Sequence, residues 1–327
     1  MPTKHSAWAK GAAALAAAGL LISSAAWSAP LAYITNQKGN SVSVIDTGKG
    51  AVVNTLALPA GSEPAGVAVS QDGRTVVVAN PGSKDVTLID DGPSLRIVAK
   101  VPVGTGGVGV ALSVDGRYAF AADFYDRNIA VVDLNTHSVV RRIVVGNIPS
   151  GLAASRDGHN LYVSNRDDNT LAEISLKTYA VTRTVAVGKH PFGIHLTADG
   201  SQLISANVES NDVSVVDLAT FTVRKTIPVG DRPYAVGEAQ QRLFVTNQYD
   251  ASVSVLDGNT LNVIGTVKVG EYPEGISAHP DGRHVYVANW MSNAVSVIDA
   301  AEMKVINTIP TGDGSRAFGE FIARGKP

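Results

Sequence analysis

The feature that most constrains this chain is an internal repeat with a period of 40–44 residues. Each repeat contains an apolar run that ends in Asn or Asp, then a second apolar run that ends in Asp in all repeats but the fourth. A Gly marks a third position in every repeat. The first run ends at Asn36, Asn80, Asp123, Asn165, Asn207, Asn247 and Asn289. Three independent marks therefore give seven repeats, and a fixed period of this length indicates a repeat architecture.

Each repeat is predicted to form four short β-strands. In the seventh repeat the runs are 274–278, 283–289, 294–299 and 304–309, and they are rich in Val, Ile, Thr and Tyr with alternating apolar positions. Asp-Gly pairs, which are typical of hairpin turns, separate the first and second runs of most repeats. After the leader no stretch keeps a 3.6-residue apolar period, so we expect no helix there. The pattern predicts an all-β fold, a seven-bladed β-propeller of four-stranded antiparallel blades.

The two ends of the chain predict how the ring closes. Residues 32–36 match the second strand of a repeat, so the first blade lacks its own first strand. Residues 316–323 match a first strand that has no repeat after it. We therefore expect the C-terminal strand to join the N-terminal blade, which removes an exposed sheet edge.

The second runs carry a family resemblance. Residues 33–36, 78–80, 162–165, 245–247 and 286–289 resemble a Tyr-Val-Thr-Asn signature, and the chain is similar to the YVTN-repeat propellers of the YncE-like group, with WD40-like repeats. The resemblance implies an exported seven-bladed propeller and implies no reaction. The repeats resemble, more weakly, the propellers of nitrite reductase haem d1 domains, amine dehydrogenase heavy chains and lactonases.

The N-terminus predicts export. Lys4 and Lys10 precede an apolar stretch at 11–22, and small residues follow it. This order is typical of a secretory signal, here cleaved after Ser28. The alternative is an uncleaved anchor. We expect residues 1–28 to be the signal peptide and residues 29–327 to be one propeller domain without a membrane span. The predicted location is the periplasm or the medium.

Charge disfavours one class of partner, and the cysteine content excludes several kinds of site. The formal net charge is −2, and without the two lysines of the leader it is −4. Nucleic acid is therefore disfavoured as a partner, because phosphates attract a surplus of Lys and Arg. The chain has no Cys, which excludes disulfides, iron–sulfur clusters, Cys-ligated zinc and a Cys nucleophile.

Candidate site residues are sought where the seven-fold pattern breaks, because residues repeated in every blade are interpreted as architectural. The turns that enter the inner strands and the loops between second and third strands share one face of a propeller. On that face one arc is small and apolar, and the other is aromatic and charged. The predicted ligand-binding residues are His190, Phe192, Arg232, Tyr234, Tyr272, Glu274, Arg316 and Trp290.

These residue types suit an anionic or aromatic ligand, because Arg pairs with carboxylates and stacks on rings. We expect Arg232 and Arg316 to flank Glu274, since their blades are neighbours around the ring. The alternative is that the aromatic residues fill gaps between blades and that the charges form a solvated rim with little effect on stability.

No catalytic residue or metal site is predicted. The sequence has no nucleophile elbow, P-loop or dinucleotide motif in a strand-to-helix context. His279 lies in a different blade from His190 and His195, and His284 is expected at the surface. The cofactor is left undetermined.

Three functional hypotheses follow. The first is a monomeric, non-enzymatic scaffold that binds a small anionic or aromatic ligand or a periplasmic protein. The second, implied by the resemblances, is a cofactor-dependent redox or accessory protein, or a lactonase-like enzyme. The third is single-stranded nucleic-acid binding through arginines and aromatic residues on the loop face.

Overall fold

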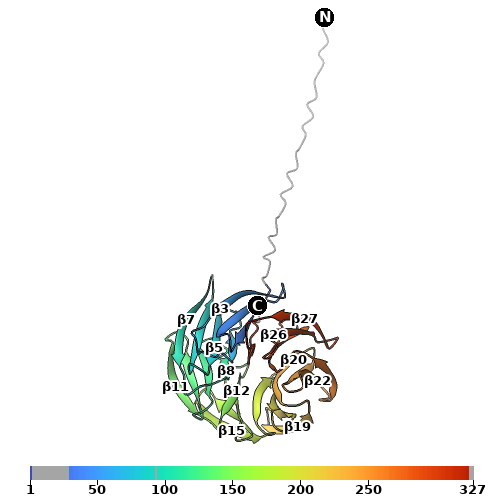
Figure 1. The fold of residues 1–327 in the computed structure, drawn as a ribbon. Coiled ribbons are helices and arrows are strands. Elements are labelled where there is room, and N and C mark those ends of the chain that lie inside the picture. Colours follow the sequence, from blue (N-terminus) through green and yellow to red (C-terminus); the bar gives the residue numbers. More distant parts are fainter. Residues whose placement is uncertain (2–28, 93, 324–327) are drawn as a thin grey trace.

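Seven antiparallel β-sheets stand around a common axis in the computed structural model, which describes residues 1, 29–92 and 94–323 (Figure 1). Six sheets have four strands, and the seventh has three regular strands, β1–β2–β3. The predicted seven-bladed propeller is confirmed, and the described residues contain no helix. The predicted signal peptide, residues 1–28, lies outside the described residues apart from Met1.

The strands take the same four positions in each blade. The inner strands are β4 (Val67–Val69), β8 (Val110–Leu112), β12 (Pro149–Ala154), β16 (Pro191–Leu196), β20 (Pro233–Ala239) and β24 (Pro273–Ala278). The second strands are β1 (Leu31–Asn36), β5 (Thr75–Asn80), β9 (Tyr118–Asp123), β13 (Asn160–Asn165), β17 (Gln202–Asn207), β21 (Arg242–Asn247) and β25 (His284–Asn289). The third strands are β2 (Ser41–Asp46), β6 (Asp85–Asp91), β10 (Asn128–Asp133), β14 (Thr170–Ser175), β18 (Asp212–Asp217), β22 (Ser252–Asp257) and β26 (Ala294–Asp299). The outer strands are β3 (Ala51–Ala57), β7 (Leu95–Pro102), β11 (Ser138–Val144), β15 (Ala180–Ala186), β19 (Thr222–Pro228), β23 (Val263–Lys268) and β27 (Lys304–Pro310).

Burial explains why the second and third strands are so apolar. In β5 and β6 five residues of each strand are buried, because neighbouring blades cover both faces of these strands. The outer strand β3 is instead largely exposed, and only Val52 and Leu56 are partly buried. A one-residue register shift recurs between the third and outer strands of every blade. Such a bulge increases the local twist, as the curved blades require.

The C-terminal segment 315–323 closes the ring, as predicted. It runs antiparallel to β1, where the amide of Tyr33 donates to the carbonyl of Phe321 (2.9 Å) and the amide of Arg316 donates to that of Thr35 (2.9 Å). The blue and red ends of the chain accordingly meet in Figure 1. The segment is not a regular strand, because it bulges toward β4, where the amide of Val67 donates to the carbonyl of Phe318 (2.9 Å).

The repeated Asn residues are architectural in the structure. The amide nitrogen of Asn36 donates to the hydroxyls of Ser41 (3.0 Å) and Ser43 (2.9 Å), which ties the second strand to the third. Its oxygen accepts from the amide of Gly312 (3.1 Å), which fixes the turn before the closing segment. Asn165 holds the amide of Gly146 in the same way (3.0 Å).

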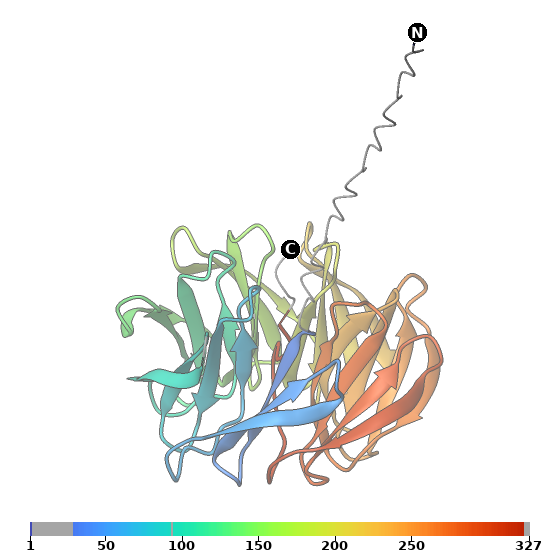
Figure 2. The same cartoon turned by 90° about the horizontal axis from the view of Figure 1, so that it is seen from above.

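The ring has two faces, and Figure 2 shows the ring edge-on. The linking-turn face carries the loops between second and third strands and the turns that enter the inner strands, at 58–64, 103–108, 145–148, 187–190, 229–232, 269–272 and 311–314. The hairpin face is the opposite end, with the turns between first and second strands at 70–74, 113–117, 155–159, 197–201, 240–241 and 279–283. Nothing in the described part of the chain forms a helix with the length and apolarity that a membrane crossing requires.

Candidate functional site

Each turn that leads into an inner strand or into the closing segment contains a residue with positive φ. Glu63, His190, Arg232 and Tyr272 all have φ between 51° and 52°, and Gly106 and Gly314 take these positions in two other turns with φ of 127° and 78°. Such a conformation costs an L-residue about 1–2 kcal/mol. The loops between the second and third strands hold these turns in place.

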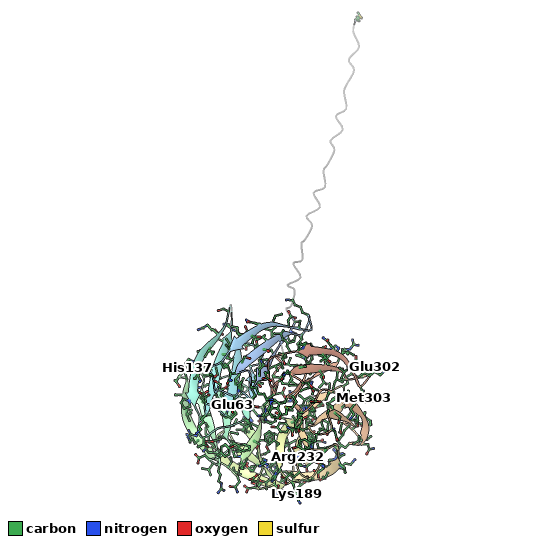
Figure 3. All side chains as sticks on the ribbon, in the orientation of Figure 1. Glu63, His137, Lys189, Arg232, Glu302 and Met303 are labelled. Atoms are coloured by element: carbon green, nitrogen blue, oxygen red, sulfur yellow. The ribbon has the colours of Figure 1, made fainter. Side chains whose placement is uncertain are left out.

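Asn side chains supply this support. Asn211 accepts from the amide of Arg232 (3.0 Å), and Asn169 accepts from the amide of His190 (2.8 Å). The side chains of these turns therefore project from a fixed backbone around the channel. In Figure 3 the labels of Glu63 and Arg232 lie nearer the centre of the propeller than those of His137 and Glu302.

The centre of the predicted site is a buried ion pair. The Nε of Arg316 donates to Oε2 of Glu274 (2.5 Å), and its Nη2 donates to the hydroxyl of Tyr234 (2.9 Å). Gln248 donates to the second carboxylate oxygen of Glu274 (2.7 Å). The side chain of Glu274 is 2% exposed and that of Arg316 is 15% exposed.

Electrostatics keeps Arg316 and Tyr234 in fixed protonation states. Burial alone would lower the pKa of Arg316, but the Glu274 carboxylate and the Tyr234 hydroxyl raise it above its usual value. Burial, and then the charge of Glu274, raises the pKa of Tyr234. The guanidinium thus stays charged and the phenol stays neutral, so neither group is poised to exchange a proton near neutral pH.

Three aromatic side chains fill the channel beneath this pair. Phe192 lies 4.4 Å from Tyr234 and 5.0 Å from Phe318 between ring centroids, and Tyr234 lies 5.7 Å from Phe318. Phe192 belongs to the fifth blade and Phe318 to the closing segment of the first. Blades six and seven stand between them in the ring, so this contact spans the channel.

A row of aromatic rings crosses the rim of the linking-turn face. Tyr249 lies 5.5 Å from Tyr272, and Tyr272 lies 6.0 Å from Trp290. We call these three residues the aromatic ladder. A cation caps each end: the guanidinium of Arg232 lies 4.7 Å from the ring of Tyr249, and the ammonium of Lys38 lies 5.2 Å from that of Trp290.

The ladder is open to solvent and incompletely bonded. Tyr249 is 52% exposed, which is unusual for a large ring. The indole N–H of Trp290 is buried and has no hydrogen-bond partner among the described residues. An unpaired buried donor costs about 1–3 kcal/mol, and this N–H is shielded from solvent, so it is not itself a contact point for a ligand on the surface.

The predicted site residues fall into three groups. Arg316, Glu274, Tyr234 and Phe192 form one connected cluster. Tyr272, Trp290 and Arg232 belong to the ladder, and Arg232 makes a ring contact with Tyr249 in place of the expected approach to Glu274. His190 stands apart, with its Nδ1 2.8 Å from a carboxylate oxygen of Glu209 and its Nε2 3.9 Å from Asp167.

Sequence reasoning missed Gln248, Phe318 and Lys38 as parts of this site. Gln248 opens a loop between second and third strands, at the position that Trp290 takes in the next blade. Phe318 occupies a position where blades five to seven have Val or Ile, so its aromatic ring was the available signal. Lys38 had no signal, because its ring contact joins the first and seventh blades.

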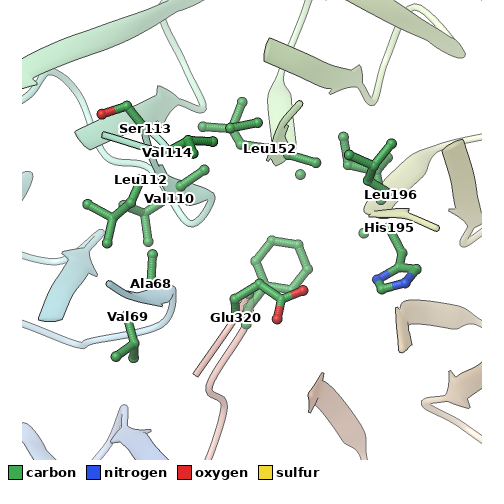
Figure 4. A pocket seen from close by; sticks show the side chains of 18 of the residues that line it. Ala68, Val69, Val110, Leu112, Ser113, Val114, Leu152, His195, Leu196 and Glu320 are labelled. Carbon is green, nitrogen blue, oxygen red and sulfur yellow. The ribbon is translucent and has the colours of Figure 1, made fainter. Parts of the chain in front are cut away.

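A cavity lies at the other end of the channel. Its volume is about 380 Å³, and its walls are the C-terminal halves of the inner strands (Figure 4). Val110, Leu112 and Leu152 give it an apolar lining, and Phe318 lies at its inner end. The cavity therefore opens on the hairpin face, where the sequence predicted no site.

One polar pair lies at the wall of this cavity. Nε2 of His195 lies 3.4 Å from Oε2 of Glu238, which also accepts from the amide of Ala198 (2.7 Å). Burial would raise the pKa of Glu238, but the contacts with His195 and Ala198 lower it below its usual value. Glu238 is therefore a carboxylate at neutral pH.

Comparisons with known proteins identify the family and the fold. A family model described as a choice-of-anchor I domain matches residues 34–203. A structure of a functionally unknown protein from Desulfotomaculum acetoxidans DSM 771 is 15% identical, with a TM-score of 0.78, and the match covers 90% of this chain and 99% of that one. Hydrazine synthase from Kuenenia stuttgartiensis is 18% identical, with a TM-score of 0.71 and coverage of 78% and 89%. At these identities the two structures show a shared fold alone, and no curated protein matched.

Proposed function

The chain belongs to the choice-of-anchor I domain family, and from this premise we propose that it is a non-enzymatic binding scaffold of the periplasm or cell exterior. The family description supports a surface-associated or secreted propeller. The finer assignment to the YVTN-repeat, YncE-like group rests on the Tyr-Val-Thr-Asn-like runs at the ends of the second strands. The periplasmic location rests on the signal-like sequence of residues 1–28.

One observation carries this proposal: the aromatic ladder with a cation at each end. Tyr, Trp and Arg dominate the binding energy of protein interfaces, because they give large contact areas at a low entropy cost. Arg232 and Lys38 add a positive charge at each end of the row, and neither side chain has an ion-pair partner among the described residues. The ladder is therefore suited to an anionic partner with flat or aromatic groups.

The shape of this face favours a partner segment over a buried small molecule. Phe192, Tyr234 and Phe318 fill the channel directly beneath it, so a ligand has to lie across the surface. An extended acidic segment of a periplasmic protein fits such a surface, with carboxylates near Arg232 and Lys38. The buried pair of Arg316 and Glu274 supports the surface from below and is not itself available to a ligand.

Binding of a defined acidic probe tests the proposal. Fluorescence anisotropy is measured with a labelled random copolymer of Glu and Tyr and the purified, leaderless protein. Trp290→Ala and Arg232→Gln should each weaken binding by about tenfold or more, since a contact of hot-spot size is worth about 2 kcal/mol. Tyr125→Ala is the matched control, because Tyr125 is a highly exposed ring on the same face outside the ladder. Equal binding by the wild type and both ladder variants would overturn the proposal.

The cavity on the hairpin face favours a second candidate function, the binding of a small apolar molecule. A volume of about 380 Å³ lies within the usual range of ligand sites. The cofactor-dependent and lactonase-like alternatives would also use this cavity, with His195 and Glu238 as its polar pair. Mass spectrometry and an absorbance spectrum of natively purified protein test them together. Leu152→Trp, which fills the cavity, should abolish retention of any molecule found there.

A further inference from the structure

The hairpin turn of the seventh blade differs from its counterparts in chemistry. In blades two to five a hydroxyl residue opens the turn and donates to an Asp two residues later, and its oxygen accepts from the amide five residues later. These hydroxyl–carboxylate pairs are Ser70–Asp72 (2.7 Å), Ser113–Asp115 (2.5 Å), Ser155–Asp157 (2.5 Å) and Thr197–Asp199 (2.7 Å). In the seventh blade His279 takes the place of the hydroxyl residue, and the residue five later is His284. The turn geometry therefore does not demand these two histidines.

Both imidazoles converge on one carboxylate oxygen. Nδ1 of His279 lies 2.9 Å from Oδ2 of Asp281, and Nδ1 of His284 lies 2.6 Å from the same atom. The three atoms lie within 4.8 Å of one another. The other carboxylate oxygen, Oδ1, accepts from the amides of Arg283 (2.7 Å) and His284 (3.1 Å), which fixes the carboxylate plane.

The hydrogen bonds of Thr47 determine which nitrogen of His279 carries the proton. The Thr47 hydroxyl donates to the carbonyl of Pro30 (2.6 Å), so toward Nε2 of His279 (3.1 Å) it acts as the acceptor. Nε2 therefore bears the hydrogen, and in the neutral ring Nδ1 has a lone pair. This lone pair accepts from the amide of Asp281 (3.2 Å) and lies 2.9 Å from the Asp281 carboxylate oxygen. A positive charge beside these two atoms, either a proton on the ring or a metal ion, offsets their repulsion.

We propose that His279, Asp281 and His284 form a binding site for a divalent transition-metal ion such as Zn²⁺. The two Nδ1 atoms and Oδ2 supply three ligands, and water completes the coordination on the exposed side of the turn. Two imidazoles and one carboxylate suit Zn²⁺ and its neighbours in the first transition series, whereas Ca²⁺ and Mg²⁺ prefer sites made of oxygen ligands. Thr47 has the role of an outer-shell partner that orients the ring of His279.

The site lies at the junction where the ring closes. His279 and His284 belong to the seventh blade, whereas Thr47 follows β2 in the first. The hydrogen bond between His279 and Thr47 thus links metal binding to the contact between these two blades. Zn²⁺ should raise the melting temperature of the protein, because an ion that binds the folded state alone stabilises it.

Calorimetric titration of untagged, chelator-treated protein with Zn²⁺ tests the site. We expect one ion per chain. His279→Ser restores the hydroxyl that the other turns carry, so it should fold normally and weaken binding by more than about a hundredfold. Thr47→Val should weaken binding by about tenfold, as losses of outer-shell partners do. His159→Gln is the matched control, since His159 lies 3.1 Å from Asp157 in a hairpin turn with a single His.

The outcomes are separable from a folding defect. The metal-free melting temperature of His279→Ser should equal that of the metal-free wild type, while the Zn²⁺-induced rise should disappear. The proposal is overturned if the wild type takes up no stoichiometric Zn²⁺. It is also overturned if His279→Ser and His284→Gln both keep wild-type affinity.

Discussion

Arg316 and Glu274 join the last strand-like segment of the chain to the seventh blade through a buried ion pair. The Nε–Oε2 distance is 2.5 Å, and the amide of Gly275 adds a hydrogen bond to the carbonyl of Arg316 (3.0 Å). Ring closure therefore combines a side-chain charge pair with backbone hydrogen bonds. Glu274 is almost fully buried, and Arg316 is its charged partner.

We expect Arg316→Gln to destabilise the fold by about 3–5 kcal/mol, because it leaves the Glu274 carboxylate buried without a counter-charge. Chemical denaturation measures the free energy of unfolding. Arg232→Gln is the control and should leave stability almost unchanged, since Arg232 makes a ring contact at the rim. This separates two arginines that the sequence placed in the same role. A wild-type free energy of unfolding for Arg316→Gln would show that solvent or Gln248 is enough to satisfy Glu274.

Deletion of residues 315–327 should leave the first blade with a free edge along β1. The deletion removes the hydrogen bonds to Leu31, Tyr33 and Thr35, so we expect aggregation or a large loss of thermal stability. Light scattering and thermal denaturation check this. Deletion of residues 324–327 alone is the control, because it keeps these bonds. Identical melting of the long deletion and the full chain would mean that the ring closes by other contacts.

Gly109→Ala should destabilise the protein by about 1–3 kcal/mol, the usual cost of an overpacked interior. A Cβ on Gly109 would lie 1.7 Å from the carbonyl oxygen of Ser150, on the inner strand of the next blade. Gly265→Ala is the matched control in an outer strand, where the nearest atoms belong to the flexible side chain of Met303 at 3.4 Å. The control should be neutral in thermal denaturation. If both variants melt alike, the inner strands have room to separate.

Stability should fall as the pH rises above about 10. Burial, and then a hydrogen bond to Asp91, raises the pKa of Tyr33, and burial raises that of Tyr286 to about 12. Unfolded tyrosines lose their protons near pH 10, so above that pH the unfolded state binds fewer protons than the folded state and gains in relative stability. Denaturation at increasing pH measures the trend. Tyr33→Phe should make the decline shallower, and an unchanged slope would contradict the assignment.

Strand positions were predictable because they depend on local patterning. The runs predicted in the seventh repeat agree with β24 to β27 to within one residue at each end. The closing strand was predictable because residues 316–323 match a repeat unit. Its bulge was not, because the bulge arises from hydrogen bonds to β4, which belongs to another blade.

The candidate site was likewise predictable only in part. The sequence identified Glu274, Arg316 and Tyr234 as departures from the repeat, and the structure brings these three together. It placed both Arg232 and Arg316 beside Glu274, and only Arg316 makes that contact. Arg232 and Arg316 looked equivalent around Glu274, yet one is on the rim beside Tyr249 and the other is buried. Which arginine pairs with Glu274 depends on how deeply each side chain is buried, and the pattern of residues along the chain does not encode this.

The sequence by itself determined the seven blades, their four strands and the place where the ring closes, because a repeated apolar pattern imposes the same local structure each time. Only the tertiary structure decided how residues from different blades meet. The filled channel on one face, the cavity on the other and the convergence of His279 and His284 on Asp281 all depend on distances across turns and blades. The repeat fixes which residues are near in the ring, whereas packing and charge decide which of them touch.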